Sequence, residues 1–412
     1  MQARKRNMER MVEAVPEAEW NAQQHFTTYS PWGAQGLMTR VGRDANRLIG
    51  GQDDSFMMVD ESAVSKKGTK SVGVARQHNG RLGKVDNCQV GVFAALARKD
   101  RVTLVDTRLY LPEEWTTDKE RCRKAGVPED RLEHRTKPQL ALELVKAGRA
   151  NGLGFAWIAA DGLYGNNPAF LRALEEEQEI FMVDVHCDQT IYLEDPAPYR
   201  PRRKSKRGRK PTRLKTRQKR IRVDKWAAQQ PESAWQTVSL RQSTRGELTA
   251  RVLHRLVWLW DGEEEQARQW HLIVRDDTDE TPRRKYSLSN APHVTPVKRL
   301  AYMQSQRYWV ERALQDAKGQ SGLAEYQVRT WTGWHHHMAM VMLVQLFMLE
   351  TKITHANTCQ LLSCADVRIL LSHFLPRRDV TTAEVIRQML VRHKQREAAT
   401  ASHRKKRKMK SA

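Results

Sequence analysis

The sequence predicts an α/β protein in which a mixed sheet flanked by helices is interrupted by a β-rich insertion and preceded by a helical segment. Three observations support this class. Residues 55–111 contain several apolar, β-branched runs, residues 137–193 alternate between helical and strand patterns, and residues 190–292 return to strand-like runs. Successive strands followed by alternating elements are typical of a mixed sheet covered by helices, with active residues at strand ends.

The N-terminal segment, residues 1–52, is expected to form short helices. Met8, Met11 and Val15 recur at helical spacing, and a second helical pattern follows the turn-like sequence TTYSPWG. A module that binds DNA ends and a purely structural role both fit this segment.

The first predicted strand, SFMMVDESAVSKKG, ends in Asp60 and Glu61 and opens into a loop that carries Lys66 and Lys67. Three further runs, SVGVARQ, NCQVGVFAALAR and RVTLVDTRLYL, predict a four-stranded meander. Asp60 is therefore expected at the end of a buried strand.

A helix is expected over TKPQLALELVKAGRANG, which has a threonine cap and a glycine stop. The apolar strand in LGFAWIAADGLYG then ends in Asp161, with Tyr164 in the following turn. A helix begins near Pro168, and EIFMVDVHCDQTIYL predicts another strand. Because both aspartates end strands, they are expected to lie side by side.

The β-rich insertion begins with a basic run at residues 200–222, RPRRKSKRGRKPTRLKTRQKRIR. A solvated linker and a phosphate-binding segment both fit this run, and the density of positive charge favours phosphate contact. Tryptophans then cluster among the strand-like runs. Most are expected to fill a core, while one at an edge could stack on an unpaired base. They are Trp226, Trp235, Trp258, Trp260 and Trp270.

Residues 297–326 predict a helix with one polar and one apolar face. Gln304, Arg307, Glu311 and Lys318 lie on the polar face. The apolar stripe is formed by Met303, Val310, Leu314 and Ala317. Glu311 is therefore expected where the helix leaves the core, in reach of an active site.

The C-terminal part begins with a helix that is apolar on nearly all sides and ends in a basic tail, ASHRKKRKMKSA, expected to be disordered. These patterns divide the chain into five segments. They are a helical N-terminal segment (1–52), the first part of the core (53–189), the basic linker and β-rich insertion (190–292), the second part of the core (293–375) and a helical, basic tail (376–412).

The chain has 412 residues and a formal net charge of +23, with a pI near 10.0, which indicates a polyanionic partner and favours nucleic acid. No apolar run reaches the roughly 18 residues that span a bilayer, so no membrane partner is expected. The N-terminus lacks the apolar stretch of a secretion signal. Five scattered cysteines without a C-x-x-C pair indicate a reducing, cytoplasmic location.

Three acids qualify as catalytic residues by position: Asp60, Asp161 and Glu311. Clustered carboxylates repel one another unless a cation neutralises them, and a pair of Mg²⁺ ions with oxygen ligands suits that role. Two such ions can activate a water or a 3′-hydroxyl for attack on a phosphodiester. Spacing alone does not select this trio from 48 acidic residues, and its rivals are Asp86, Asp106 and Asp184.

Three stretches carry a resemblance to a known family: VDESAVSKKGTKSVGVARQ with GKVDNCQVGVF, then IAADGLYG, then QSQRYWVERALQDAKGQSGLAEYQVRTWTGWHHHM. Across about residues 55–340 the chain resembles insertion-sequence transposases of the DDE type, DDE-superfamily endonucleases with an RNase H-like core. In the branch with a β-strand insertion, the last helix has the pattern Tyr-x2-Arg-x3-Glu-x6-Lys. This chain has Arg307, Glu311 and Lys318 at those spacings but Gln304 in place of the tyrosine.

The resemblance implies roles for these residues. Asp60, Asp161 and Glu311 would be the catalytic metal ligands, holding two Mg²⁺ ions for which Mn²⁺ is expected to substitute. Arg307 and Lys318 would grip phosphates of the DNA end. Glu61, next to Asp60, is expected to act indirectly, outside the set of metal ligands.

Other residues are candidates for DNA contact. Lys66 and Lys67 are expected to bind phosphates, because no apolar residue flanks them. Tyr164, three residues after Asp161 in a glycine-flanked turn, could either touch DNA near the site or take a helix-capping packing role.

The function implied by the resemblance is cleavage of double-stranded DNA at transposon ends, followed by attack of the freed 3′-hydroxyl on target DNA. A hairpinned end is a further hypothesis, motivated by the insertion. The expected protein is bacterial, cytoplasmic and nucleoid-associated, and forms a homodimer on DNA. A domesticated DNA-binding protein that no longer transposes and a plain DNA endonuclease are the alternatives.

Overall fold

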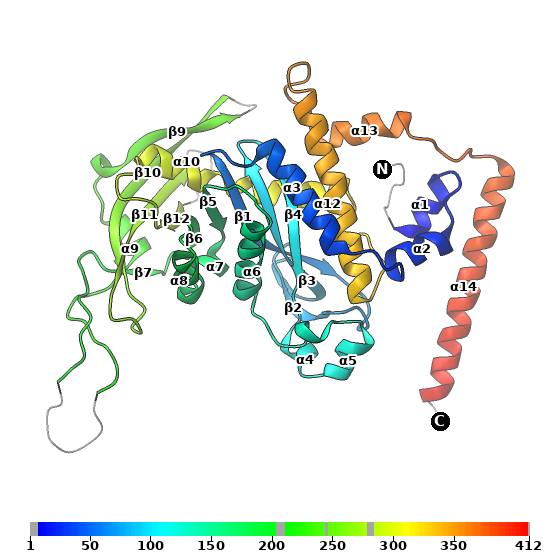
Figure 1. The fold of residues 1–412 in the computed structure, drawn as a ribbon, viewed down its shortest axis with the longest axis horizontal. Coiled ribbons are helices and arrows are strands. Elements are labelled where there is room, and N and C mark those ends of the chain that lie inside the picture. The colour runs from blue at the N-terminus through cyan, green and yellow to red at the C-terminus, as the bar shows by residue number, and fades with distance from the viewer. Residues whose placement is uncertain (1–6, 203–210, 244–245, 278–283, 411–412) are drawn as a thin grey trace.

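The computed structural model describes residues 7–202, 211–243, 246–277 and 284–410, so the middle of the predicted basic run, 203–210, lies outside the described residues. The predicted fold class is confirmed. A mixed sheet crosses the molecule and helices flank it, which is the RNase H-like arrangement (Figure 1). No helix in the described part of the chain is long and apolar enough to cross a membrane.

Six strands form the core part of the sheet: β1 (Ser55–Ser65), β2 (Ala75–Asn79), β3 (Lys84–Arg98), β4 (Arg101–Leu109), β5 (Trp157–Ala160) and β6 (Phe181–Val185). β1 is central, antiparallel to β3 and parallel to β5, and β5 is parallel to β6. The four early strands exist as predicted, but they do not form a simple meander. β3 is long enough to pair with β2 along one part and with β4 along another.

The insertion strands continue the same sheet. They are β9 (Gln236–Ser243), β10 (Gly246–Leu259), β11 (Arg268–Asp277) and β12 (Arg284–Ser289). β12 pairs antiparallel with β6, and β11, β10 and β9 follow in order. Two short strands, β7 (Thr190–Ile191) and β8 (Ile221–Arg222), form a separate pair. Trp226 and Trp270 are buried, consistent with the predicted core role.

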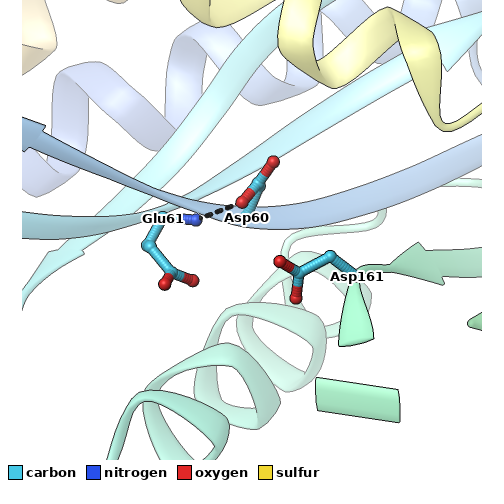
Figure 2. A group of neighbouring side chains, drawn as sticks. All are labelled: Asp60, Glu61 and Asp161. Carbon is cyan, nitrogen blue, oxygen red and sulfur yellow. Dashed lines mark hydrogen bonds between the residues drawn. The ribbon is translucent and has the colours of Figure 1, made fainter. Parts of the chain in front are cut away.

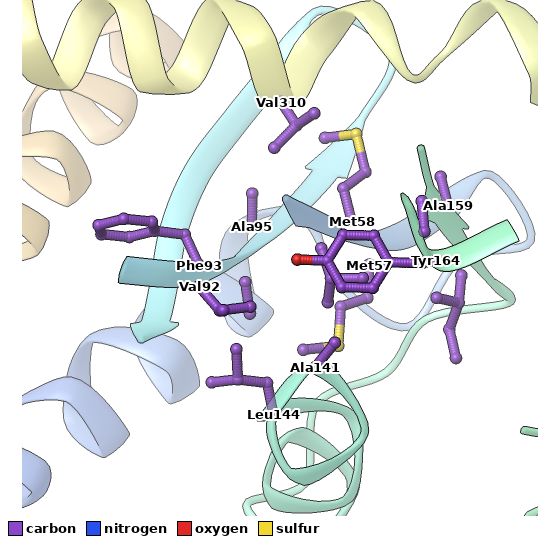
Figure 3. Packing of buried hydrophobic residues seen from close by; sticks show 14 of the residues in the cluster. Met57, Met58, Val92, Phe93, Ala95, Ala141, Leu144, Ala159, Tyr164 and Val310 are labelled. Carbon is purple, nitrogen blue, oxygen red and sulfur yellow. The ribbon is translucent and has the colours of Figure 1, made fainter. Parts of the chain in front are cut away.

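Helices α6 (Lys137–Ala150) and α11 (Tyr308–Gln320) cover opposite faces of the sheet around β1. Figure 3 shows Val310 of α11 on one side of β1 and Ala141 and Leu144 of α6 on the other. Side chains alternate along a strand, so Met57 and Met58 pack toward different helices. Both are fully buried, and the alternation carries on to the acidic residues that follow.

The predicted helix over 297–326 is two helices, α10 (Val297–Ser305) and α11. Around Gln306 and Arg307 the backbone bonds span three residues instead of four, from Gln306 to Met303 and from Val310 to Arg307. The Trp309 indole also donates to the Gln306 side chain over 3.0 Å, which fixes this tightened turn. The predicted apolar stripe is buried.

The remaining helices lie around this core. α3 (Ala34–Ile49) and α12 (Trp331–Thr354) pack on each other and on β4. α14 (Thr382–Lys410) stands apart from the sheet in Figure 1 and is joined to α1 (Met8–Ala14) by Arg392 and Glu13. The predicted disorder from residue 401 is wrong up to Lys410, because α14 continues to that residue. The other helices are α2 (Trp20–Thr28), α4 (Glu113–Thr116), α5 (Lys119–Lys124), α7 (Gly162–Gly165), α8 (Pro168–Glu176), α9 (Val223–Ala228) and α13 (Cys364–Phe374).

Candidate active site

Asp60 and Asp161 are brought together by the parallel pairing of β1 and β5. Val59 is in register with Ala160, so the residue that follows each of them emerges at the same point of the sheet. The predicted strand end at Asp60 is wrong, because β1 stays paired with β3 up to Ser65 and Asp60 lies within the strand. Asp161 caps the turn after β5, where it accepts a hydrogen bond from the Leu163 amide over 2.9 Å. The predicted side-by-side placement of the two aspartates is therefore found.

A third carboxylate joins them. One oxygen each of Asp60, Glu61 and Asp161 lies within 4.8 Å of the others, and the described residues contain no other group of three such ligands. Figure 2 shows Asp60 and Glu61 on opposite sides of β1, with the carboxylate of Asp161 turned toward both. Three clustered carboxylates are the donor set that a hard divalent cation prefers, so these residues fit a metal ion.

The electrostatics of the cluster agree with that fit. Burial, reinforced by the Asp161 carboxylate, raises the pKa of Asp60 to about 8. Burial and the Glu61 carboxylate also raise the pKa of Asp161. Both shifts show that the negative charges are poorly compensated by the protein itself, and a bound cation would relieve this cost.

Glu61 is held in place by two donors from the α6 side of the sheet. Lys137 Nζ donates to its Oε1 and the Tyr164 hydroxyl to its Oε2, each over 3.1 Å. The capping box formed by Thr136 and Gln139 fixes the first turn of α6, where Lys137 lies. Tyr164 is fully buried, so in this structure it packs behind the acids and does not offer the predicted DNA contact.

Glu311 lies across from the cluster, on the first turn of α11. Its side chain is 56 % exposed, and its Oε1 accepts from Arg307 Nη2 over 2.8 Å. It lines the same cleft as Asp60 and Asp161 but is not among the three carboxylates that lie within 4.8 Å of one another. The third predicted acid is therefore close to the site but engaged by an arginine.

Arg307 contacts carboxylates from three different elements. Besides Glu311, its Nε lies 2.7 Å from Asp184 Oδ2 on β6, and its Nη1 lies 3.9 Å from Asp60 Oδ2 on β1. The guanidinium thus partly neutralises the acids from the α11 side. Its predicted grip on a DNA phosphate stays a prediction.

A chain of hydrogen bonds orients Arg307 from behind. The Gln304 side-chain amide donates to Ser287 Oγ over 2.8 Å, and that hydroxyl donates to Asp184 Oδ1 over 2.7 Å. Gln304 is buried. At the position where the related pattern has tyrosine, this chain therefore has a buried amide that supports Arg307 through Ser287 and Asp184. Asp184, a rival in the sequence reasoning, holds Arg307 and does not join the acidic cluster.

The acids line a cleft of about 580 Å³ whose opposite wall carries positive charge. Lys318 lies there, half-buried, and burial lowers its pKa. Its predicted contact with a DNA phosphate stays a prediction. His78, Arg81 and Gln315 also line the cleft, and sequence reasoning did not single them out. The available signal was the turn His78-Asn79-Gly80-Arg81, which places a basic side chain at the tip of the β2–β3 hairpin.

The two predicted phosphate-binding lysines have different environments. Lys66 Nζ lies 3.4 Å from the centroid of the Tyr326 ring and donates to the Tyr326 carbonyl. Burial lowers the pKa of Lys66 to about 8. Lys67 is exposed, so it is the more accessible of the two to a DNA backbone.

A larger cavity, of about 720 Å³, is lined by Trp309, Tyr302 and Arg299. Asp54 and Asp100 also line it, and the Asp54 carboxylate is paired with Arg98 at 2.7 Å. In the described residues these acids form no group of three metal-ligating side chains. The larger cavity therefore lacks an acidic cluster, and the chemistry is concentrated in the smaller cleft.

The fold and the clustered carboxylates define a class of metal-dependent nucleases, and comparison with known families specifies it. The profile of the DDE superfamily endonucleases matches residues 1–247, and the chain belongs to this family. The match contains Asp60, Glu61 and Asp161 and stops before Glu311.

One curated relative is similar over much of the chain. It is named as a probable transposase for insertion sequence element IS701, from Microchaete diplosiphon. The two sequences are 24 % identical over 307 residues, which is 74 % of this chain and 67 % of the relative.

Proposed function

We propose that this protein is a DNA transposase that cuts transposon ends and joins the freed 3′-hydroxyl to target DNA. The observation that carries the proposal is the meeting of Asp60, on β1, with Asp161, which directly follows the adjacent parallel strand β5, and the presence of Glu311 in the same cleft. Family membership and the similarity to a transposase support it. The net charge of +23 suits a double-stranded DNA partner.

Asp60, Asp161 and Glu311 would hold the divalent ions that DDE endonucleases use, proposed as two Mg²⁺ with Mn²⁺ as a substitute. When bound, such ions lower the pKa of an attacking water and neutralise charge on the reacting phosphodiester. Arg307 then has a double task. In the free protein it pairs with Glu311 and holds that side chain near the acids. When Glu311 leaves Arg307 to bind a metal ion, the guanidinium becomes available to a phosphate. Lys318 and Arg81 supply further positive charge along the cleft wall.

The test is a cleavage and joining assay with purified protein, Mg²⁺ and the DNA that flanks the reading frame. Glu311→Gln should lower cleavage at least about 100-fold, because one oxygen ligand loses its charge. Binding of the same DNA should stay within about threefold of wild type, because phosphate contacts dominate affinity. Gln315→Ala, one turn further along α11 on the same cleft wall, is the matched control and should cut normally.

The outcomes separate the alternatives. Full activity in Glu311→Gln would contradict the site. Cutting by wild type without joining of a pre-cut end would identify a plain endonuclease, and DNA binding without cutting would identify a domesticated DNA-binding protein. The same products test the hairpin hypothesis, which fails when wild type yields nicked ends and no hairpinned ends.

We also propose that the protein acts as a homodimer on DNA. Most of the large apolar side chains that are exposed in the described residues lie between Leu343 and Val391, on α12, α13, α14 and the segments that connect them. Apolar surface concentrated in this way is typical of a protein interface. A second copy is the partner proposed here, because two transposon ends must be held together for joining.

A further inference from the structure

Glu61 lies on the face of the sheet opposite to Asp60, yet its carboxylate belongs to the same cluster. Side chains alternate along β1, so Asp60 faces α11 and Glu61 faces α6. Asp161, at the end of the neighbouring strand, lies between them (Figure 2). The cluster therefore receives carboxylates from both faces of the sheet, and Glu311 on α11 lines the same cleft.

Two donors fix the orientation of Glu61. Lys137 and Tyr164 each bind one of its two oxygens over 3.1 Å. Each carboxylate oxygen has two acceptor positions, so one position on each oxygen stays available. This is the arrangement of a metal-binding carboxylate whose geometry is set by supporting hydrogen bonds.

A simple ion pair between Glu61 and Lys137 does not account for the geometry. An ion pair needs only the lysine, but a carboxylate oxygen of Glu61 also lies within 4.8 Å of an oxygen of Asp161 and of Asp60. Two carboxylates placed together without a cation repel each other. A cation bound between the two carboxylates would turn this repulsion into attraction of both to the ion.

We propose that Glu61 is a direct ligand of the divalent metal centre, sharing an ion with Asp161, and that Lys137 and Tyr164 are positioning residues for it. The proposal deepens the proposed function and rests on it for the presence of a metal. It gives the centre four carboxylates: Asp60 and Glu311 from the α11 face, Glu61 from the α6 face, and Asp161 between them.

The direct test replaces Glu61 with a nitrogen ligand of similar length. Glu61→His, loaded with Mn²⁺ in the absence of DNA, should show hyperfine coupling to a bound ¹⁴N nucleus in pulsed electron paramagnetic resonance. Wild type is the baseline, and Gln315→His, also on the cleft wall, is the matched control. Neither should show the coupling. Mn²⁺ bound to Glu61→His without ¹⁴N coupling would overturn the proposal.

Affinity measurements give a second test that does not depend on the histidine variant folding. Glu61→Gln should weaken Mn²⁺ binding, measured by calorimetry, by at least about 100-fold, because a charged ligand is lost. Asp184→Asn removes a nearby charge that is outside the cluster. Its loss of Mn²⁺ affinity should be about tenfold smaller than the loss caused by Glu61→Gln. Equal losses of Mn²⁺ affinity in the two variants would mean that Glu61 acts only through its charge and is not a metal ligand.

The positioning role of Tyr164 can be tested by its effect on Mn²⁺ affinity. Tyr164→Phe removes only the buried hydroxyl and should weaken Mn²⁺ binding about 10-fold, within the range for supporting groups of metal ligands. Unchanged affinity in a folded Tyr164→Phe variant would contradict the positioning role. None of these measurements uses DNA, so a protein that binds metal through Glu61 but fails to cut would refute the transposase proposal alone.

Discussion

At the scale of single residues, the acidic cluster lowers the stability of the metal-free fold. Asp60 is a carboxyl whose pKa is raised to about 8, mainly by burial and then by Asp161. The ordinary pKa of an aspartate carboxyl, which applies in the unfolded chain, is 3.8. Such a group binds more protons in the folded state, so it lowers the free energy of unfolding as pH rises through this window.

Asp60→Asn should therefore stabilise the metal-free protein. The gain in melting temperature over wild type should be small near pH 4, grow as pH rises toward 8, and level off above it. Thermal unfolding in a chelating buffer measures this difference. Adding Mg²⁺ should raise the melting temperature of wild type more than that of Asp60→Asn, because the ion neutralises the carboxylate. A gain that does not grow with pH would contradict the raised pKa.

The sequence was enough to predict that Asp60 and Asp161 meet, because each follows an apolar run that forms one of two parallel, neighbouring strands. The expected reason was only half right, since Asp161 directly follows β5 but β1 continues past Asp60 to Ser65. The sequence could not predict that Glu61 belongs with them. Neighbouring residues on a strand point to opposite faces, which argues against a shared site. Glu61 reaches the cluster only because Asp161 lies at a strand end, between the two faces.

At the scale of elements, the insertion contributes to the site through its last strand. β12 pairs with β6, and Ser287 on β12 connects Gln304 of α10 to Asp184 of β6. Asp184 in turn holds Arg307 at the start of α11. The tightened turn between α10 and α11 and the insertion strand are therefore fixed together.

Ser287→Ala tests this connection. The variant removes the shorter of the two hydrogen bonds of the buried Gln304 amide and leaves it only the Ile273 carbonyl at 3.5 Å, which should destabilise the protein by about 1–3 kcal/mol. Cleavage should fall several-fold more than DNA binding, because Arg307 loses its fixed orientation. Ser289→Ala is the matched control, since the Ser289 hydroxyl is also buried but binds the Phe181 carbonyl. It should lose stability, measured by urea unfolding, and keep its cleavage rate. Equal losses of cleavage in the two variants would mean that Ser287 acts only through stability.

The elements themselves were predicted with mixed success for physical reasons. The strands around Asp60 and the cap of α6 follow from local patterns, and both are found. The break at Gln306 depends on a contact with Trp309, and helical periodicity does not reveal it. The joining of β12 to β6 is a long-range pairing, which alternation of polar and apolar residues cannot specify.

At the scale of the whole molecule, one sheet links the catalytic core to the insertion, while the C-terminal helices extend away from it (Figure 1). Ile386, Met389 and Leu390 on α14 are each more than half exposed. Their spacing of three and four residues places them on one side of the helix. This side is available to a second copy, while Arg392 holds α14 on α1 through Glu13.

Replacing Ile386 and Leu390 together with lysine should therefore prevent dimer formation without unfolding the chain. Both side chains are exposed in the single copy, so the change in its unfolding free energy should stay within about 0.5 kcal/mol. Light scattering of the protein with transposon-end DNA should give a complex of two chains for wild type and of one chain for the variant. Val294→Lys changes an apolar residue that is 89 % exposed and remote from α14 in the sequence, and it should leave the dimer intact. Since joining needs two ends in one complex, the double variant should lose paired-end joining more strongly than single-end cutting. Dimers that persist in the double variant would place the interface elsewhere on the molecule.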